Sequence, residues 1–220
     1  EAIRQVKVEE STASGTIAWV ADRGNTSADT AYINLLKGKG YTVETPNLNQ
    51  GGNRLNNNLS MLNDAVLIIL GPNTSFRRFG NEKNTWNTIT TPILCIQQVT
   101  VQRNGMGWIN STDYGAYNND IEIKQASHPI FTGQNLTNGD RLKFNTGNTV
   151  YAMRTSSAGN GTILAQGVSG DRPPLAVVWE KGTSFYNGGM TPADTRMCLA
   201  FPWQGRLNQL TAQATSMFEN

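Results

Sequence analysis

The residues able to do nucleophilic or acid–base chemistry are few, since this chain of 220 residues holds two cysteines and one histidine. Cys95 lies inside the apolar run 92–97, so its side chain is expected to point into the core. An acyl-transfer enzyme on an α/β sheet carries its nucleophile at a sharp strand-to-helix turn, in a pattern such as Gly-x-Ser-x-Gly. That pattern does not occur here. We therefore expect Cys95 to be buried and non-nucleophilic.

The single histidine, His128, is followed by proline in the segment 128–133, which favours a turn. We expect it to hold a structural hydrogen bond rather than to act as a base. Apart from Asp120 and Glu122 the carboxylates are not clustered, so a transition-metal site is not supported. A calcium site formed by Asp and Asn oxygens in the loops is left as an alternative. We expect no catalytic residue, no metal and no cofactor, and whether the protein is an enzyme stays uncertain.

Polar residues follow three of the apolar runs, and they are the candidates for ligand binding. The carboxyl ends of parallel strands form the ligand-binding edge of an open α/β sheet, so these loops are expected to meet in one cleft. The candidates are Asp22, Arg23, Asn25, Thr26, Asn73, Gln97 and Gln98. The segment 24–26 is also similar to the phosphate loop of flavodoxins. However, Asp22 and Asp29 would repel a phosphate, and no acidic aromatic flavin loop follows, so no flavin is expected.

Aromatic residues among polar neighbours are candidates for a carbohydrate platform, because exposed rings present an apolar face with a polar edge. They are Trp108, Tyr114, Tyr117 and Trp203. Each ring could equally belong to the core.

The elements that position these residues repeat regularly up to Gln97. Short apolar runs rich in β-branched residues predict strands at 16–21, 41–45, 65–70 and 92–97. Amphipathic spacing predicts helices at 27–38, 53–64 and 75–89. The run 65–70 is apolar throughout, as expected of a strand covered on both faces. The pattern predicts an α/β fold, with a flavodoxin-like open parallel sheet and helices on both faces.

The second half is predicted to add β-structure over roughly residues 98–190. Strands are expected at 142–144, 150–153, 162–166, 175–179, 184–186 and 197–201, and a final helix at 210–218. We expect one α/β domain over residues 15–220, preceded by an arm or linker at 1–14.

The composition of the chain limits the classes of partner that it is expected to bind. A formal charge of +2 with 15% charged residues gives no field that implies nucleic acid or an acidic membrane. No apolar run approaches the roughly 20 residues of a membrane-spanning helix, so no span is expected. A surface rich in uncharged polar residues favours an exported, extracellular protein.

Sequons occur at Asn25, Asn58, Asn73, Asn110, Asn135 and Asn160, a slight excess that does not establish glycosylation. Cys95 and Cys198 are expected to be free thiols, with a single bridge as the alternative.

The order of the segments resembles the class I glutamine amidotransferase-like superfamily. It is most similar to the ThuA-like branch and to related modules of large secreted bacterial proteins. The resemblance is carried by the segments 17–20, 40–43, 64–70, 91–94, 128–133, 163–167, 174–182, 196–201 and 210–214. It implies a flavodoxin-like core with added β-structure. The amidotransferase cysteine and its His–Glu partners have no counterpart in this sequence, so glutaminase activity is not carried over.

These observations predict a non-catalytic or catalytically degenerate accessory or interaction module of an exported protein, with a protein partner or a second copy as its target. One alternative is a structural subunit of an extracellular assembly, whose arm adds a strand to a sheet edge. Another is a ThuA-like carbohydrate-related enzyme or sugar-binding domain. The arm carries Ile3, Val6 and Val8, which gain nothing unless they are covered. We expect it to pair with an edge of the β-rich half, within the chain or in a neighbour.

Overall fold

We describe the fold from a computed structural model, which places residues 14–21, 26–46, 48, 55–74, 76–147, 149–202 and 205–220. Within these residues nine strands form one sheet in the order β2-β1-β3-β4-β11-β10-β9-β6-β7, and β5 pairs with β8 in a separate sheet. The parallel strands are β1 (Thr16–Val20), β2 (Thr42–Glu44), β3 (Leu67–Leu70), β4 (Ile93–Cys95) and β11 (Arg196–Leu199). The others are β5 (Tyr114–Asn118), β6 (Asp120–Ile123), β7 (Arg141–Lys143), β8 (Thr149–Met153), β9 (Thr162–Gly167) and β10 (Pro174–Trp179).

The parallel part of the sheet has the strand order of a flavodoxin-like fold. β1 lies between β2 and β3, and β4 lies between β3 and β11, with every pair parallel. The order 2-1-3-4, completed by β11 in the fifth place, is that of a doubly wound sheet. The predicted fold class is therefore confirmed, and the four strands predicted up to Gln97 all occur.

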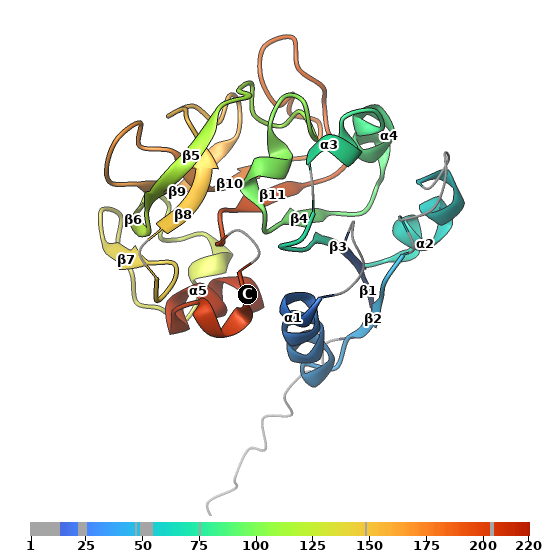
Figure 1. Ribbon diagram of the computed structural model, residues 1–220, viewed down its shortest axis with the longest axis horizontal. Helices are drawn as coiled ribbons and strands as arrows, with labels where there is room; N and C mark the ends of the chain where they lie inside the picture. Colours follow the sequence, from blue (N-terminus) through green and yellow to red (C-terminus); the bar gives the residue numbers. More distant parts are fainter. Residues whose placement is uncertain are drawn as a thin grey trace, which may run out of the picture.

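Helices cover both faces of the parallel strands (Figure 1). Side chains of β1 alternate between the faces: Ile17 and Trp19 pack on one side, and Ala18 and Val20 on the other. The first face carries α1 (Ser27–Gly38), α5 (Ala212–Glu219) and the short 3₁₀ turn η3 (Pro129–Phe131). The second carries α2 (Leu59–Asp64), α3 (Phe76–Phe79) and α4 (Lys83–Thr88). Further 3₁₀ turns are η1 (Asn56–Asn58), η2 (Gln98–Val101) and η4 (Leu207–Gln209).

Two segments that were each predicted as one continuous helix form two shorter elements in the structure. The helix expected at 53–64 is realised as η1 followed by α2, and the one expected at 75–89 is divided into α3 and α4 by a turn at residues 80–82. Gly80 begins that turn, and glycine is a poor helix former because its backbone loses the most freedom on folding. The division lets Phe79 and Trp86 both reach the core, with ring centroids 5.2 Å apart.

The strand predicted at 184–186 is wrong, because this segment is a loop. The ring of Phe185 is fully buried between Trp108 and Trp179, with centroid distances of 5.9 Å to each. Its backbone carbonyl accepts from the amide of Asn160, and its amide donates to the carbonyl of Met190. The apolar pattern that suggested a strand therefore reflects one aromatic anchor.

The β-rich half extends the parallel sheet. β10 pairs antiparallel with both β11 and β9, and β6 pairs antiparallel with β9 and β7. Among the helices of the described residues, none is long and apolar enough to cross a bilayer. The predicted arm, with Ile3, Val6 and Val8, lies outside the described residues apart from Ser14.

Candidate functional site

The loops after β1, β3 and β4 meet at the carboxyl edge of the parallel sheet. Asn73, after β3, donates from its side-chain amide to the carboxylate of Asp29 on α1, over 2.9 Å, and to the hydroxyl of Thr26. The hydroxyls of Thr74 and Thr100 lie 3.2 Å apart. Three of the predicted ligand-binding residues, Asp22, Arg23 and Asn25, lie outside the described residues. The proximity of the loops is observed, and ligand binding there stays a prediction.

Asp29 is the centre of this rim, although it is fully buried. Its carboxylate accepts from the indole N–H of Trp19 (3.0 Å) and from the amide and hydroxyl of Thr26 (2.8 Å each), besides Asn73. A Cβ on Gly71 would stand 2.8 Å from the Asp29 oxygen, so glycine is needed for this close approach. The carboxylate is thus occupied by the protein's own donors, and it joins the start of α1 to β1 and to the loop after β3.

Gln98 does not belong to an open cleft, which corrects the prediction for this residue. It is fully buried, its side-chain amide donates to the carbonyl of Pro174, and its side-chain oxygen accepts from the amide of Met153 over 2.9 Å. It therefore links η2 to the β-rich half. Gln97 is 1% exposed and donates to the carbonyl of Pro72 over 3.4 Å, but its side-chain oxygen meets no donor among the described residues.

Cys95 is fully buried, as predicted, and its thiol donates to the carbonyl of Gln97 over 3.1 Å. Cys198 lies directly beside it in the β4–β11 pair, and the structure holds both as free thiols. Burial, with a smaller contribution from Cys95, raises the pKa of the Cys198 thiol. A buried thiol with a raised pKa is a poor nucleophile.

His128 caps η3, where its Nδ1 accepts from the amide of Ile130 over 3.3 Å. Burial lowers its pKa, and the carboxylate of Glu180 acts in the opposite direction. This is the structural hydrogen bond that the His-Pro sequence predicted. Within the described residues, no group of three or more histidine, cysteine or acidic side chains is placed to hold a metal ion.

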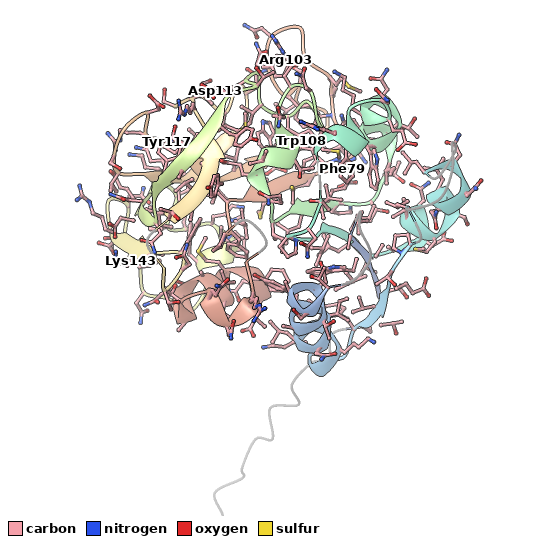
Figure 2. The ribbon with its side chains drawn as sticks, in the orientation of Figure 1. Phe79, Arg103, Trp108, Asp113, Tyr117 and Lys143 are labelled. Atoms are coloured by element: carbon pink, nitrogen blue, oxygen red, sulfur yellow. The ribbon has the colours of Figure 1, made fainter. Side chains whose placement is uncertain are left out.

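The aromatic candidates do not form one platform. Trp108 is fully buried, its indole donates to the side chain of Asn87 over 2.9 Å, and its assignment to an exposed platform is wrong. Tyr114 and Tyr117 are three residues apart on β5 and pack against opposite cores of the molecule. Figure 2 shows Tyr117 on β5, away from Trp108. The Tyr117 hydroxyl donates to Asp171 over 2.8 Å, and Trp203 lies outside the described residues.

A groove of about 300 Å³ opens in the face of the sheet that carries α1 and α5. Its floor is apolar and consists of Ile17, Leu67, Leu94 and Met197, from β1, β3, β4 and β11. These positions lie in the amino-terminal or middle part of their strands, away from the Asp29 rim.

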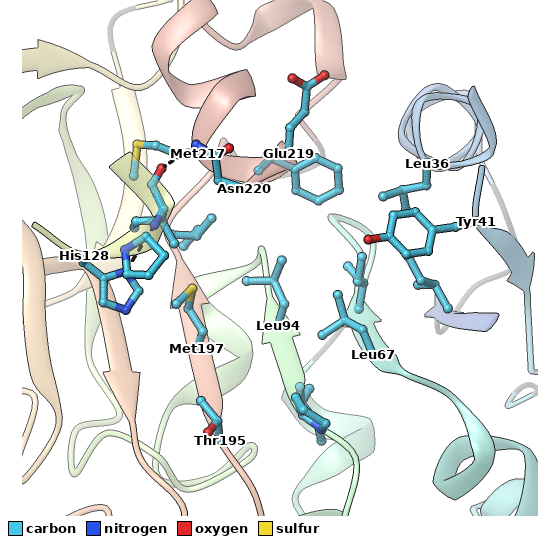
Figure 3. A pocket seen from close by; sticks show the side chains of 18 residues that line it. Leu36, Tyr41, Leu67, Leu94, His128, Thr195, Met197, Met217, Glu219 and Asn220 are labelled. Carbon is cyan, nitrogen blue, oxygen red and sulfur yellow. Dashed lines mark hydrogen bonds between the residues drawn. The ribbon is translucent and has the colours of Figure 1, made fainter. Parts of the chain in front are cut away.

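The walls of the groove come from α1, α5 and their neighbouring loops (Figure 3). Leu36 and Tyr41 lie on one side, and Met217 lies on the other. The two helices approach each other where the rings of Tyr32 and Phe218 meet edge to face, with centroids 5.1 Å apart. Lys39, which caps α1, and Glu219 at the end of α5 form an exposed ion pair of 3.5 Å. The helices therefore touch through these pairs but leave an apolar gap above the strands.

Sequence reasoning missed the groove. Residues such as Leu94 and Met197 were assigned to strands correctly, but an apolar strand residue looks the same in sequence whether or not a helix covers it. No short motif would have revealed it, since its lining comes from segments between Ile17 and Asn220.

No family model and no curated protein matches the chain. Among solved structures, the fold is similar to a chain in the structure of PurLQS from Thermotoga maritima, with a TM-score of 0.50 and 11% sequence identity. The match covers 93% of this chain and 95% of that chain. At this identity the similarity shows the fold alone.

Proposed function

We propose that this chain is a non-catalytic interaction module, and that its binding surface is the apolar groove between α1 and α5. The observation that carries the proposal is the groove itself. Its volume of about 300 Å³ and its mainly aliphatic floor are those of a site for an apolar group. The floor is only partly in contact with solvent, since Ile17 is 1% and Leu94 is 9% exposed, and an apolar group bound in the groove would cover what remains accessible.

The chemistry of the rim also supports a binding role. The Asp29 carboxylate is occupied by Trp19, Thr26 and Asn73, and the Cys95 thiol is buried. Neither group is prepared to act on a substrate. We also propose, from the low fraction of charged residues, that the module belongs to an exported protein. Its relation to the ThuA-like branch is proposed from the order of the sequence segments.

The methionines provide a direct test. Met197 and Met217 line the groove, whereas Met61, Met106, Met153 and Met190 pack in the opposite core. The chain is labelled with ¹³C at the methionine methyl groups and titrated with hexan-1-ol as an apolar probe. We expect saturable shifts of the Met197 and Met217 signals, with the other four as internal controls.

Shifts that are uniform over the six methionines, or that are confined to the four controls, would contradict the groove as the binding surface.

The proposal that the chain is non-catalytic needs a separate test. Hydrolysis of L-glutamine and of aryl glycosides is assayed with the wild type and with the variants Cys95→Ser and Asp29→Asn. A turnover above the uncatalysed rate that either substitution abolishes would contradict it.

A further inference from the structure

Cys95 and Cys198 lie directly opposite each other on neighbouring strands. In the parallel β4–β11 pair, Cys198 is the ladder partner of Cys95. Neighbouring strands lie about 4.8 Å apart, and the side chains of ladder partners point to the same face of the sheet. Both cysteines accordingly pack in the core cluster on the face that carries α2, α3 and α4. The two side chains are therefore placed side by side, although they are far apart in the sequence.

The surroundings of this cysteine pair are apolar. Leu70 is the other ladder partner of Cys95, Val177 is the other ladder partner of Cys198, and both are fully buried. After burial, a side-chain hydrogen bond with Cys95 is the next cause that raises the pKa of Cys198, so the two sulfur atoms lie within hydrogen-bonding distance. The reactive group beside each thiol in the ladder is therefore the other thiol.

We propose that Cys95 and Cys198 are a modification site, at which a low-molecular-weight disulfide such as oxidised glutathione converts the two thiols into an intramolecular disulfide bond. The spacing fits, because the Cα atoms of bridged cysteines usually lie roughly 4.4–6.8 Å apart, a range that includes the distance between neighbouring strands. The bond joins β4 to β11, the strand through which the β-rich half is attached to the parallel strands. This inference does not depend on the groove.

The reaction consists of two successive thiol–disulfide exchanges. The thiolate of one cysteine attacks a sulfur of oxidised glutathione, forms a mixed disulfide and releases one glutathione thiolate. The thiolate of the other cysteine then attacks the protein sulfur of the mixed disulfide and releases the second glutathione. The protein loses two protons and two electrons, and oxidised glutathione is reduced to two molecules of glutathione. Because both thiols are fully buried, the exchange takes place while the chain is unfolded or opened.

The test is refolding of the wild type from urea in a buffer of reduced and oxidised glutathione. We expect a monomer lighter by about 2 Da, in which the tryptic peptides 84–103 and 197–206 are joined by a bond that dithiothreitol breaks. The control is Cys198→Ser, which is refolded in the same way and should show neither change. Wild-type protein that keeps two free thiols, carries only glutathione adducts or is linked between chains would overturn the proposal.

A second measurement tests whether the bond is compatible with the folded structure, because two cysteines can also be joined in a misfolded chain. The bridged protein should have a Tm about 5–10 °C above that of the same protein after reduction and refolding in dithiothreitol, since the cross-link closes a loop of about 100 residues in the unfolded chain. The methyl signal of Met217, which packs on the opposite face, should keep its position. An equal or lower Tm in the bridged protein, or loss of that Met217 signal, would overturn the proposal.

Discussion

Asp29 links three parts of the fold through one carboxylate. It accepts from the indole of Trp19 in β1, from Thr26 at the start of α1 and from Asn73 after β3. Thr26 is the N-cap of α1 and Asp29 is its third residue, so the bond from the Thr26 amide is one half of a capping box. Thr26, which the sequence analysis assigns to a ligand site, therefore also caps the start of α1.

Replacing Asp29 with alanine should lower the free energy of unfolding by about 2–4 kcal/mol, because the buried indole N–H of Trp19 loses its acceptor and α1 loses a cap. Chemical denaturation measures the change. Asp113→Ala is the control, since that side chain is 70% exposed and stands 3.9 Å from Arg154, and it should cost less than about 0.5 kcal/mol. Equal losses in the two variants would refute the structural role of Asp29.

His128 should make stability depend on pH. Burial lowers its pKa in the folded protein below the ordinary value of about 6.5, so folding favours the neutral ring. Its contribution is fully present above about pH 6.5 and is lost as pH falls through the lowered folded pKa. Protonation would also remove the Nδ1 acceptor used by Ile130.

The measurement is the Tm of the wild type and of His128→Asn at pH 7.5 and pH 5. Asparagine keeps an acceptor at the N-cap but does not titrate. We expect the variant to lose less Tm on acidification than the wild type. A decrease of the same size in both proteins would show that His128 is not responsible.

At the scale of elements, the parallel strands were predictable because local patterns determine them. The apolar run at β3 and the capped amphipathic stretch at α1 each carry their own signal. The division between α3 and α4 has a local cause in Gly80, a poor helix former. The loop around Phe185 depends on contacts with distant residues such as Trp108, which a local pattern cannot contain. The strands β5 and β6 were expected only as irregular or antiparallel structure, since their short polar sequences alternate weakly.

Arg196 connects β11, an interior strand of the sheet, to the segment that follows α4. It is fully buried in β11, and its guanidinium donates to the carbonyls of Ile89 (2.6 Å) and Thr91 (3.0 Å), just beyond the end of α4. Burial lowers its pKa to about 10, so it stays charged at neutral pH. A cation at the end of a helix also complements the helix dipole.

Arg196→Met should therefore lower the free energy of unfolding by about 3 kcal/mol, because buried carbonyls lose their donors. The exposed Arg154→Met, whose side chain is 55% exposed, is the matched control and should change it by less than about 0.5 kcal/mol. Denaturation by urea reports both values. If both variants unfold at the same urea concentration, the capping role assigned to Arg196 is wrong.

At the scale of the whole molecule, the two ends of the parallel sheet differ in character. The carboxyl end is joined by hydrogen bonds among Asp29, Thr26 and Asn73, whereas the groove over Leu67 and Leu94 is left open on the α1–α5 face. Fold-level reasoning placed any ligand at the carboxyl end, because open α/β sheets bind there. The location of an uncovered surface depends on how far apart α1 and α5 pack, which no local sequence pattern encodes.

The central claim is that the groove between α1 and α5 is the binding surface. The most direct test compares the affinity for hexan-1-ol of a groove variant with that of a rim variant, each read from the Met197 and Met217 methyl signals. Leu94→Trp places a large ring on the groove floor, and Asn73→Ala removes a donor at the carboxyl rim. We predict that Leu94→Trp weakens binding at least about tenfold and that Asn73→Ala leaves it unchanged. Unchanged binding in Leu94→Trp together with weakened binding in Asn73→Ala would contradict the claim.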